Sequence, residues 1–174
     1  SSNIHSPVAG TVTKLDKIVD TRGYKKQCIV IRTDVKNESN LEEIEYPLKK
    51  EIDLKPEEIL QRISDFGIVG LGGATFPSHV KLTVPKGRKA EYLILNGVEC
   101  EPYLTADHQL MLEKAEEIVE GAKILLKILG IKACAIGIEN NKPDAIKAMQ
   151  TAIDKAGTGH VEIVVIPTLY PSGG

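Results

Sequence analysis

The sequence predicts an α/β fold in which a parallel sheet is flanked by helices, preceded by a small β-rich segment. Two observations predict it. Beyond about residue 90, short apolar runs alternate with longer amphipathic stretches, which is the pattern of repeated β-α-β units. Before about residue 45, the chain holds only short β-type runs and turn residues. We therefore expect a β segment with a linker at 1–45 and an α/β domain at 46–174.

Composition limits the classes of function. The 174 residues, 42% hydrophobic and 26% charged, suit one domain with a small appendage. The net charge of -2 argues against a nucleic-acid partner. The apolar runs are too short to cross a bilayer, so we expect any membrane attachment to occur through partner proteins. Cys28, Cys100 and Cys134 form no C-x-x-C pair, which favours a reducing cytoplasmic setting and no metal centre within this segment.

The β-rich segment has two predicted strands, 5–13 and 28–33, with the turn residues Asp20-Thr-Arg-Gly23 between them. Two strands alone do not make a stable domain. The run Ser6-Pro-Val-Ala-Gly-Thr-Val12 resembles the opening strands of barrel-sandwich hybrid domains, which implies half of such a module. Lys25 and Lys26 lack the sequence that flanks the modified lysine of lipoyl and biotinyl carriers, so we expect a structural role.

The α/β domain begins with an amphipathic helix from Pro56 to about Gly67, and Pro77 is expected to open a short helix that reaches about Val84. The remaining elements are predicted to be a strand at 91–96, one long helix whose apolar stripe runs from Met111 to Leu129, a strand at 132–138, a helix at 141–157 and a strand at 161–166. This order predicts a Rossmann-like parallel sheet with right-handed crossovers. Ligands of such sheets bind beyond the carboxyl ends of the strands.

A glycine-dense loop at 67–81 joins a Phe-Pro step to Lys81. Glycines let a backbone approach a ligand closely, and a lysine supplies a cation for phosphate. The Walker A pattern is excluded because Gly73-Ala74 stands where Lys-Ser/Thr is required. The dinucleotide fingerprint is excluded because Thr75 replaces its third glycine. The loop therefore indicates a nucleotide or flavin site of another class.

A second group of polar residues follows the first strand of the sheet, where Asn96 precedes Glu99 and Glu101. Two carboxylates at this spacing could act as acid and base, bind a metal or accept sugar hydroxyls, and the residues alone do not choose among these roles. A metal would need more ligands, for which Asp107 and His108 are the near candidates.

Together, Gly70-Leu-Gly-Gly-Ala-Thr-Phe-Pro-Ser-His-Val-Lys81 and Asn96-Gly-Val-Glu-Cys-Glu-Pro102 resemble the RnfC family, the C subunits of Rnf-type electron transport complexes. That family is similar to the FMN- and NADH-binding subunit of respiratory complex I. The resemblance implies two sets of contacts: Gly70, Gly72, Gly73, Lys81, Asn96 and Glu99 to FMN, and Phe76, Lys81 and Glu101 to NADH. It implies no catalytic side chain and no metal ligand here, because the flavin performs the hydride chemistry.

The resemblance implies a fragment of a subunit that moves electrons between NAD(H), FMN and iron-sulfur clusters in a ferredoxin-linked, ion-translocating membrane complex. The subunit would lie peripherally on the cytoplasmic face of the cell membrane, bound through partner subunits. The 4Fe-4S clusters are expected only in a part beyond Gly174, so the fragment alone would be inactive and would hold a partial FMN pocket. Two alternatives stay open, a related cobalamin reductase of diol-utilisation microcompartments and a non-catalytic assembly module.

Four positions depart from the complex I pattern. Leu71 stands where that subunit has arginine, and Val98 stands where it has aspartate. Thr75 and His79 each replace a glycine.

Overall fold

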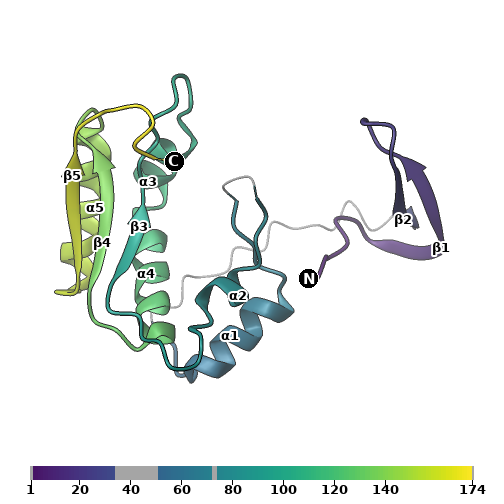
Figure 1. Cartoon of the computed structure of the whole chain (residues 1–174), viewed down its shortest axis with the longest axis horizontal. Helices are drawn as coiled ribbons and strands as arrows, with labels where there is room; N and C mark the ends of the chain where they lie inside the picture. Colours follow the sequence, from purple (N-terminus) through teal and green to yellow (C-terminus); the bar gives the residue numbers. More distant parts are fainter. Residues whose placement is uncertain (1, 34–50, 72–73, 174) are drawn as a thin grey trace. The chain divides into compact units, whose positions relative to one another are not determined.

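The computed structural model describes residues 2–33, 51–71 and 74–173 (Figure 1). The chain divides into two compact units. One is Ile4–Pro47, and the other is Leu48–Gly174 together with Ser1–Asn3. The linker predicted at 36–45 and the predicted boundary between 45 and 46 lie outside the described residues.

The smaller unit is an antiparallel hairpin of β1 (Gly10–Val19) and β2 (Lys25–Thr33). Asp20 forms the turn, since its Oδ1 accepts the N–H groups of Arg22 at 3.0 Å and Tyr24 at 2.9 Å. The first strand was predicted at 5–13 and instead runs from 10 to 19, because the second strand pairs with it as far as Val19. Leu15 is 79% exposed, which leaves this hairpin without a core among its described residues.

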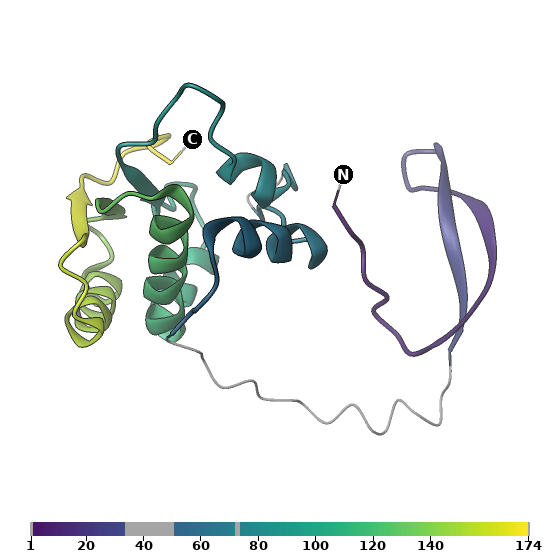
Figure 2. The same ribbon diagram turned by 90° about the horizontal axis from the view of Figure 1, so that it is seen from below.

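The larger unit contains a parallel sheet in the order β3 (Leu93–Asn96), β4 (Cys134–Glu139) and β5 (Val161–Ile166). The crossover after β3 contains α3 (Ala106–Glu113) and α4 (Ala115–Leu129), and the crossover after β4 is α5 (Pro143–Ala156). Helices α4 and α5 pack side by side, with α4 between α5 and α1 (Pro56–Asp65) (Figure 2). The predicted α/β class with a parallel sheet flanked by helices is confirmed.

The core lies between α4, α5 and one face of the sheet. Alternate residues of β4 point into it, and its members include Cys134, Ile136, Ile138, Val119, Ala122, Leu126, Met149 and Ile153. Full burial of a side chain such as Ile138 stabilises the fold by about 2 kcal/mol. On the opposite face of the edge strand β3, Ile94 is 73% exposed.

The prediction of one long helix with a stripe from Met111 to Leu129 is wrong. Lys114 leaves the helical conformation, with φ -126° and ψ 26°, and it ends α3 and begins α4. The apolar stripe gives no sign of the break because Met111 and Val119 are both buried in the same core. The first turn of α3 is held by hydrogen bonds to the loop after β3.

Two further helices precede the sheet. Helix α1 begins with Pro56 at its first turn, and the Glu58 carboxylate accepts the Lys55 N–H at 2.7 Å, as in a capping box. Helix α2 (Ser78–Leu82) ends two residues before the predicted limit at Val84. Its last turn closes when the Thr83 hydroxyl donates to the His79 carbonyl at 2.7 Å.

Candidate functional site

The glycine loop leaves α1 in a fixed direction. The Gly67 N–H donates to the Ser64 carbonyl at 3.0 Å and the Ile68 N–H to the Ile63 carbonyl at 3.1 Å, which is a Schellman C-cap. Gly67 has φ +65°, and a Cβ there would lie 2.0 Å from the Asn3 carbonyl oxygen. Both the backbone angle and the lack of space therefore require glycine at 67.

The loop is closed at its base like a short hairpin. The Gly70 N–H donates to the Phe76 carbonyl at 2.8 Å, and the Ser78 N–H donates to the Ile68 carbonyl at 3.0 Å. Between them, Val69 and Pro77 form an antiparallel bridge. The predicted site residues Gly72 and Gly73 lie outside the described residues. The described part of the tip is exposed.

The described loop residues differ in what the fold demands of them. A Cβ on Gly70 would lie 3.7 Å from the Phe76 carbonyl oxygen, an ordinary contact, so packing does not require glycine there. Thr75 has φ +49°, a strained angle for a β-branched residue. Phe76 is 51% exposed, and Lys81 on α2 is exposed with no ion pair to another described residue. The Nδ1 atom of His79 is buried and has no hydrogen-bond partner among the described residues.

The loop after β3 is tied to the segment after β5 through Asn96. Its side-chain Nδ2 donates to the Gly173 carbonyl at 3.0 Å, and its Oδ1 accepts the Val98 N–H at 3.1 Å. The Gly173 N–H donates to Cys100 Sγ at 3.3 Å. The loop after β3 and the segment after β5 are therefore joined by hydrogen bonds to one amide side chain and one thiol.

The two glutamates of this loop have different surroundings. Glu99 caps helix α3, because its Oε1 accepts the Asp107 N–H at 2.9 Å and its Oε2 accepts the His108 N–H at 3.1 Å. A carboxylate at this position also interacts favourably with the helix dipole. Glu101 is exposed, and its carboxylate accepts no hydrogen bond from another described residue. Of these two carboxylates, Glu101 is therefore the one free to meet a ligand.

Sequence reasoning missed a buried ion pair beside this loop. Glu139, the last residue of β4, is 0% exposed, and Lys142 is 6% exposed. The Lys142 ammonium donates to Glu139 Oε2, to Asn141 Oδ1 at 3.2 Å and to the Glu99 carbonyl at 3.3 Å. The sequence feature that could have revealed them is the polar run Glu139-Asn-Asn-Lys142 at the end of the central strand. Residues that contact a ligand are expected at this end of a parallel sheet.

Close by, His108 Nε2 lies 2.9 Å from Asp144 Oδ1 and connects the first turn of α3 to that of α5. This hydrogen bond, together with the Ala145 N–H, holds the pKa of the Asp144 carboxyl below its ordinary value. This hydrogen bond adds a second attachment for the start of α3.

The structure therefore gathers the predicted residues into two groups. Asn96, Glu99 and Glu101 share the carboxyl edge of the sheet, whereas Gly70, Phe76 and Lys81 share the segment between α1 and the end of α2. No hydrogen bond or ion pair joins these groups within the described part of the chain. Among the described residues, no cluster of three His, Cys, Asp or Glu side chains could hold a metal ion. No described helix has the length and apolar character needed to span a membrane.

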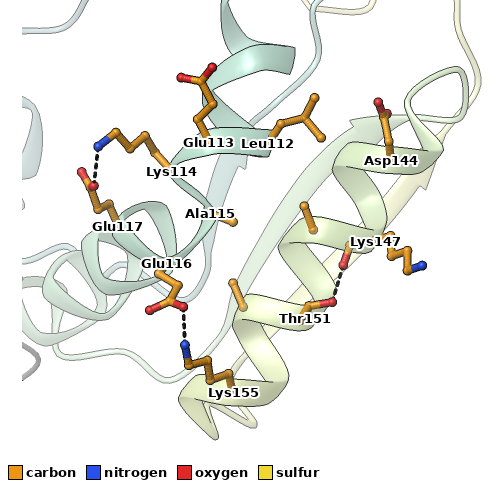
Figure 3. A pocket seen from close by; sticks show the side chains of 12 residues that line it. Leu112, Glu113, Lys114, Ala115, Glu116, Glu117, Asp144, Lys147, Thr151 and Lys155 are labelled. Carbon is orange, nitrogen blue, oxygen red and sulfur yellow. Dashed lines mark hydrogen bonds and ion pairs between the residues drawn. The ribbon is translucent and has the colours of Figure 1, made fainter.

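A surface hollow of about 710 Å³ lies elsewhere, between the α3–α4 junction and α5 (Figure 3). Figure 3 shows that charged side chains line it, with Lys114 paired to Glu117 at 2.9 Å and Lys155 paired to Glu116 at 2.5 Å. None of the predicted site residues contributes to it.

The fold and its two loops define a Rossmann-like α/β domain with a glycine hairpin ahead of its sheet. Residues 63–174 match the family model Complex1_51K, the Nuo51 FMN-binding domain, and the chain belongs to this family.

The curated relatives are more specific. The chain is 45% identical over 174 residues to the C subunit of the proton-translocating ferredoxin:NAD(+) oxidoreductase complex of Clostridium ljungdahlii, covering 99% of this chain and 37% of the relative. It is 39% identical over 173 residues to the C subunit of the Na(+)-translocating ferredoxin:NAD(+) oxidoreductase complex of Acetobacterium woodii. This match covers 98% of this chain and 38% of that relative. The predicted resemblance to the RnfC family is thus confirmed, and the chain spans little more than a third of these relatives' length.

A solved structure of similar fold is an NAD+-reducing [NiFe]-hydrogenase in the air-oxidized state. It superposes with a TM-score of 0.58 over 68% of this chain and 22% of the hydrogenase chain, at 21% sequence identity. At this identity the likeness concerns the fold alone.

Proposed function

We propose that this chain is the FMN- and NAD(H)-binding part of the C subunit of an ion-translocating ferredoxin:NAD(+) oxidoreductase complex. The observation that carries the proposal is the 45% identity to such a subunit over 174 residues, together with the FMN-binding family match at 63–174. The curated relatives described above are all subunits of such complexes, which favours electron transfer over cobalamin reduction or a purely structural module.

The glycine loop fits a flavin nucleotide. Packing does not require a glycine at position 70, and a missing side chain there leaves room for the close approach of a ligand. Lys81 offers a cation that pairs with no other described residue, five positions beyond a half-exposed aromatic ring, Phe76. In the proposal, Gly70, Gly72 and Gly73 lie against FMN, Lys81 binds phosphate, and Phe76 stacks on the dinucleotide.

The carboxyl edge of the sheet supplies the polar side of the site. The side chains of Asn96 and Glu99 each make two hydrogen bonds within the fold. They would therefore contact FMN only through their remaining oxygen lone pairs and the second amide hydrogen of Asn96. Glu101 is free to accept hydrogen bonds from NADH. When bound, FMN would supply the hydride-accepting and single-electron chemistry of the site. The side chains of this chain bind and orient the nucleotides, and none serves as a nucleophile.

In the complete complex, the iron-sulfur clusters and the exchange with ferredoxin would belong to parts of the subunit and complex outside this chain. Association with the cytoplasmic face of the membrane would occur through partner subunits.

Titration of FMN with the full-length subunit, followed by quenching of flavin fluorescence, tests the proposal. We expect saturable binding that weakens by at least about tenfold in Lys81→Ala, since hydrogen bonds to charged groups contribute about 1.5–3 kcal/mol. Lys86→Ala is the matched control, because Lys86 is an exposed lysine in the loop that follows α2. If the wild-type subunit does not quench flavin fluorescence, the proposed flavin function is refuted. If Lys81→Ala and Lys86→Ala bind FMN with equal affinity, Lys81 is not part of the site.

A further inference from the structure

Lys142 and Glu139 form a buried ion pair at the carboxyl end of the central strand. Their side chains are 7% and 0% exposed. The second carboxylate oxygen of Glu139, Oε1, has no hydrogen-bond partner among the described residues, so Lys142 is the group that compensates this buried charge. Burying two charges is costly, and a well-packed apolar pair often stabilises a fold equally well or better. Stability therefore does not explain the pair.

The hydrogen bonds of the ammonium suggest what the pair does. An ammonium has three protons, and three oxygens lie around Lys142 Nζ: those of Glu139, Asn141 and the Glu99 main chain. Glu139 and Asn141 belong to β4 and the turn after it, whereas Glu99 belongs to the loop after β3. The ammonium thus connects the core of the sheet to the backbone of the acidic loop, residues 97–105.

Glu99 is consequently held on both sides. Its carbonyl accepts from Lys142, and its carboxylate accepts from the first turn of α3. Glu101 follows two residues later with an exposed carboxylate. We propose that Lys142, supported by Glu139, is a positioning residue that fixes the main chain at Glu99 and thereby determines where the Glu101 carboxylate meets NADH. The part that concerns NADH rests on the function proposed above.

The same chain offers a matched comparison. Glu120 and Lys123 on α4 also form an ion pair at spacing i, i+3, with an N–O distance of 2.8 Å, and Glu120 is 6% exposed. The Lys123 ammonium donates to both carboxylate oxygens of Glu120, and it makes no hydrogen bond to the described residues of the acidic loop. Loss of Lys123 therefore removes a largely buried pair without releasing the loop.

The test compares Lys142→Met, the double variant Glu139→Leu/Lys142→Met and the control Lys123→Met in the full-length subunit. The double variant replaces the pair with apolar side chains, so it leaves no uncompensated buried charge and keeps the fold if the single variant does not. The first measurement is hydrogen exchange at the Asp107 and His108 amides, whose acceptor is the Glu99 carboxylate. We expect about tenfold faster exchange in the double variant, with β4 amides unchanged, since a hydrogen bond from a charged group is lost.

The second measurement is NADH affinity in a double-mutant cycle with Glu101→Gln. We expect the double variant to weaken NADH binding about tenfold, with little further effect once Glu101 has been changed, because residues that act through one another are non-additive. Lys123→Met should alter neither measurement. If amide exchange at Asp107 and His108 is the same in the double variant as in the wild type, Lys142 does not position the acidic loop. If the double variant weakens NADH binding just as much when Glu101 has already been changed to Gln, Lys142 does not act through Glu101. If the wild-type subunit binds no NADH, the proposed function fails, while the exchange rates still decide the role of Lys142 in the loop.

Discussion

Replacing Glu99 with alanine removes the cap of α3 and leaves a carboxylate two residues away untouched. In the structure, both Glu99 oxygens accept main-chain N–H groups, at 2.9 and 3.1 Å. Thr105, at the N-cap position itself, makes no capping hydrogen bond with its side chain. Glu99 is therefore the side chain that caps α3 in the structure.

The expected cost follows from these contacts. Loss of a helix N-cap costs about 0.5–2 kcal/mol. The favourable interaction of a carboxylate with the helix dipole adds about 0.3–1 kcal/mol. We therefore expect Glu99→Ala to lower the free energy of unfolding by about 2 kcal/mol. Glu99→Gln should cost less, because it keeps one acceptor oxygen and loses the charge.

Urea unfolding followed by far-UV circular dichroism measures this cost. With a slope of about 2 kcal/mol per molar urea, the midpoint should fall by about 1 M in Glu99→Ala. Glu101→Ala is the control: this side chain is exposed and accepts no hydrogen bond from another described residue, so its variant should stay within about 0.5 kcal/mol of wild type. Equal midpoints for the two variants would refute the view that Glu99 is the capping residue and Glu101 the free one.

Three other predictions use the same protein. Thr75→Gly should raise the free energy of unfolding by up to about 1 kcal/mol, because glycine adopts φ +49° without strain; a lower urea midpoint would contradict this. The lowered pKa of Asp144 means that its contribution to stability is complete above its ordinary pKa of about 4 and is lost as pH falls through the lowered value. The difference in the free energy of unfolding between wild type and Asp144→Asn should therefore become smaller as the pH falls from 7 to 3. A difference that stays constant would contradict this prediction. Burial raises the pKa of Cys134, so this thiol should react with a thiol reagent more slowly than Cys28 or Cys100 in the native protein, and all three should react alike in urea.

Periodicity predicted the sheet and its helices because each element buries one regular face. It failed at Lys114, where the helix is interrupted while the apolar stripe continues into the same core. The first turn of α3 is held by hydrogen bonds from Asp107 and His108 to Glu99, which lies in the preceding loop. Such contacts between separate segments leave no local signature in the sequence.

The candidate site was likewise predicted from the sequence only in part. The motifs placed Asn96, Glu99 and Glu101 at a strand end, and the structure has them there. The sequence did not distinguish the two glutamates, because the capping role of Glu99 depends on where α3 begins. Lys142 escaped notice because a lysine after two asparagines is typical of an exposed turn, and only the packing of β4 and the acidic loop buries it.

The cap on α3 also changes the electrostatic field at the edge of the sheet. A helix N-terminus carries about half a positive charge, which offsets much of the charge of Glu99, and Lys142 offsets that of Glu139. A nucleotide bound at this edge would therefore meet the field of roughly one uncompensated carboxylate, Glu101, among these three acids. Because a nearby negative charge disfavours an anionic reduced flavin, the reduction potential of FMN bound here would respond mainly to Glu101. One exposed side chain would then adjust the driving force of electron transfer without disturbing the fold.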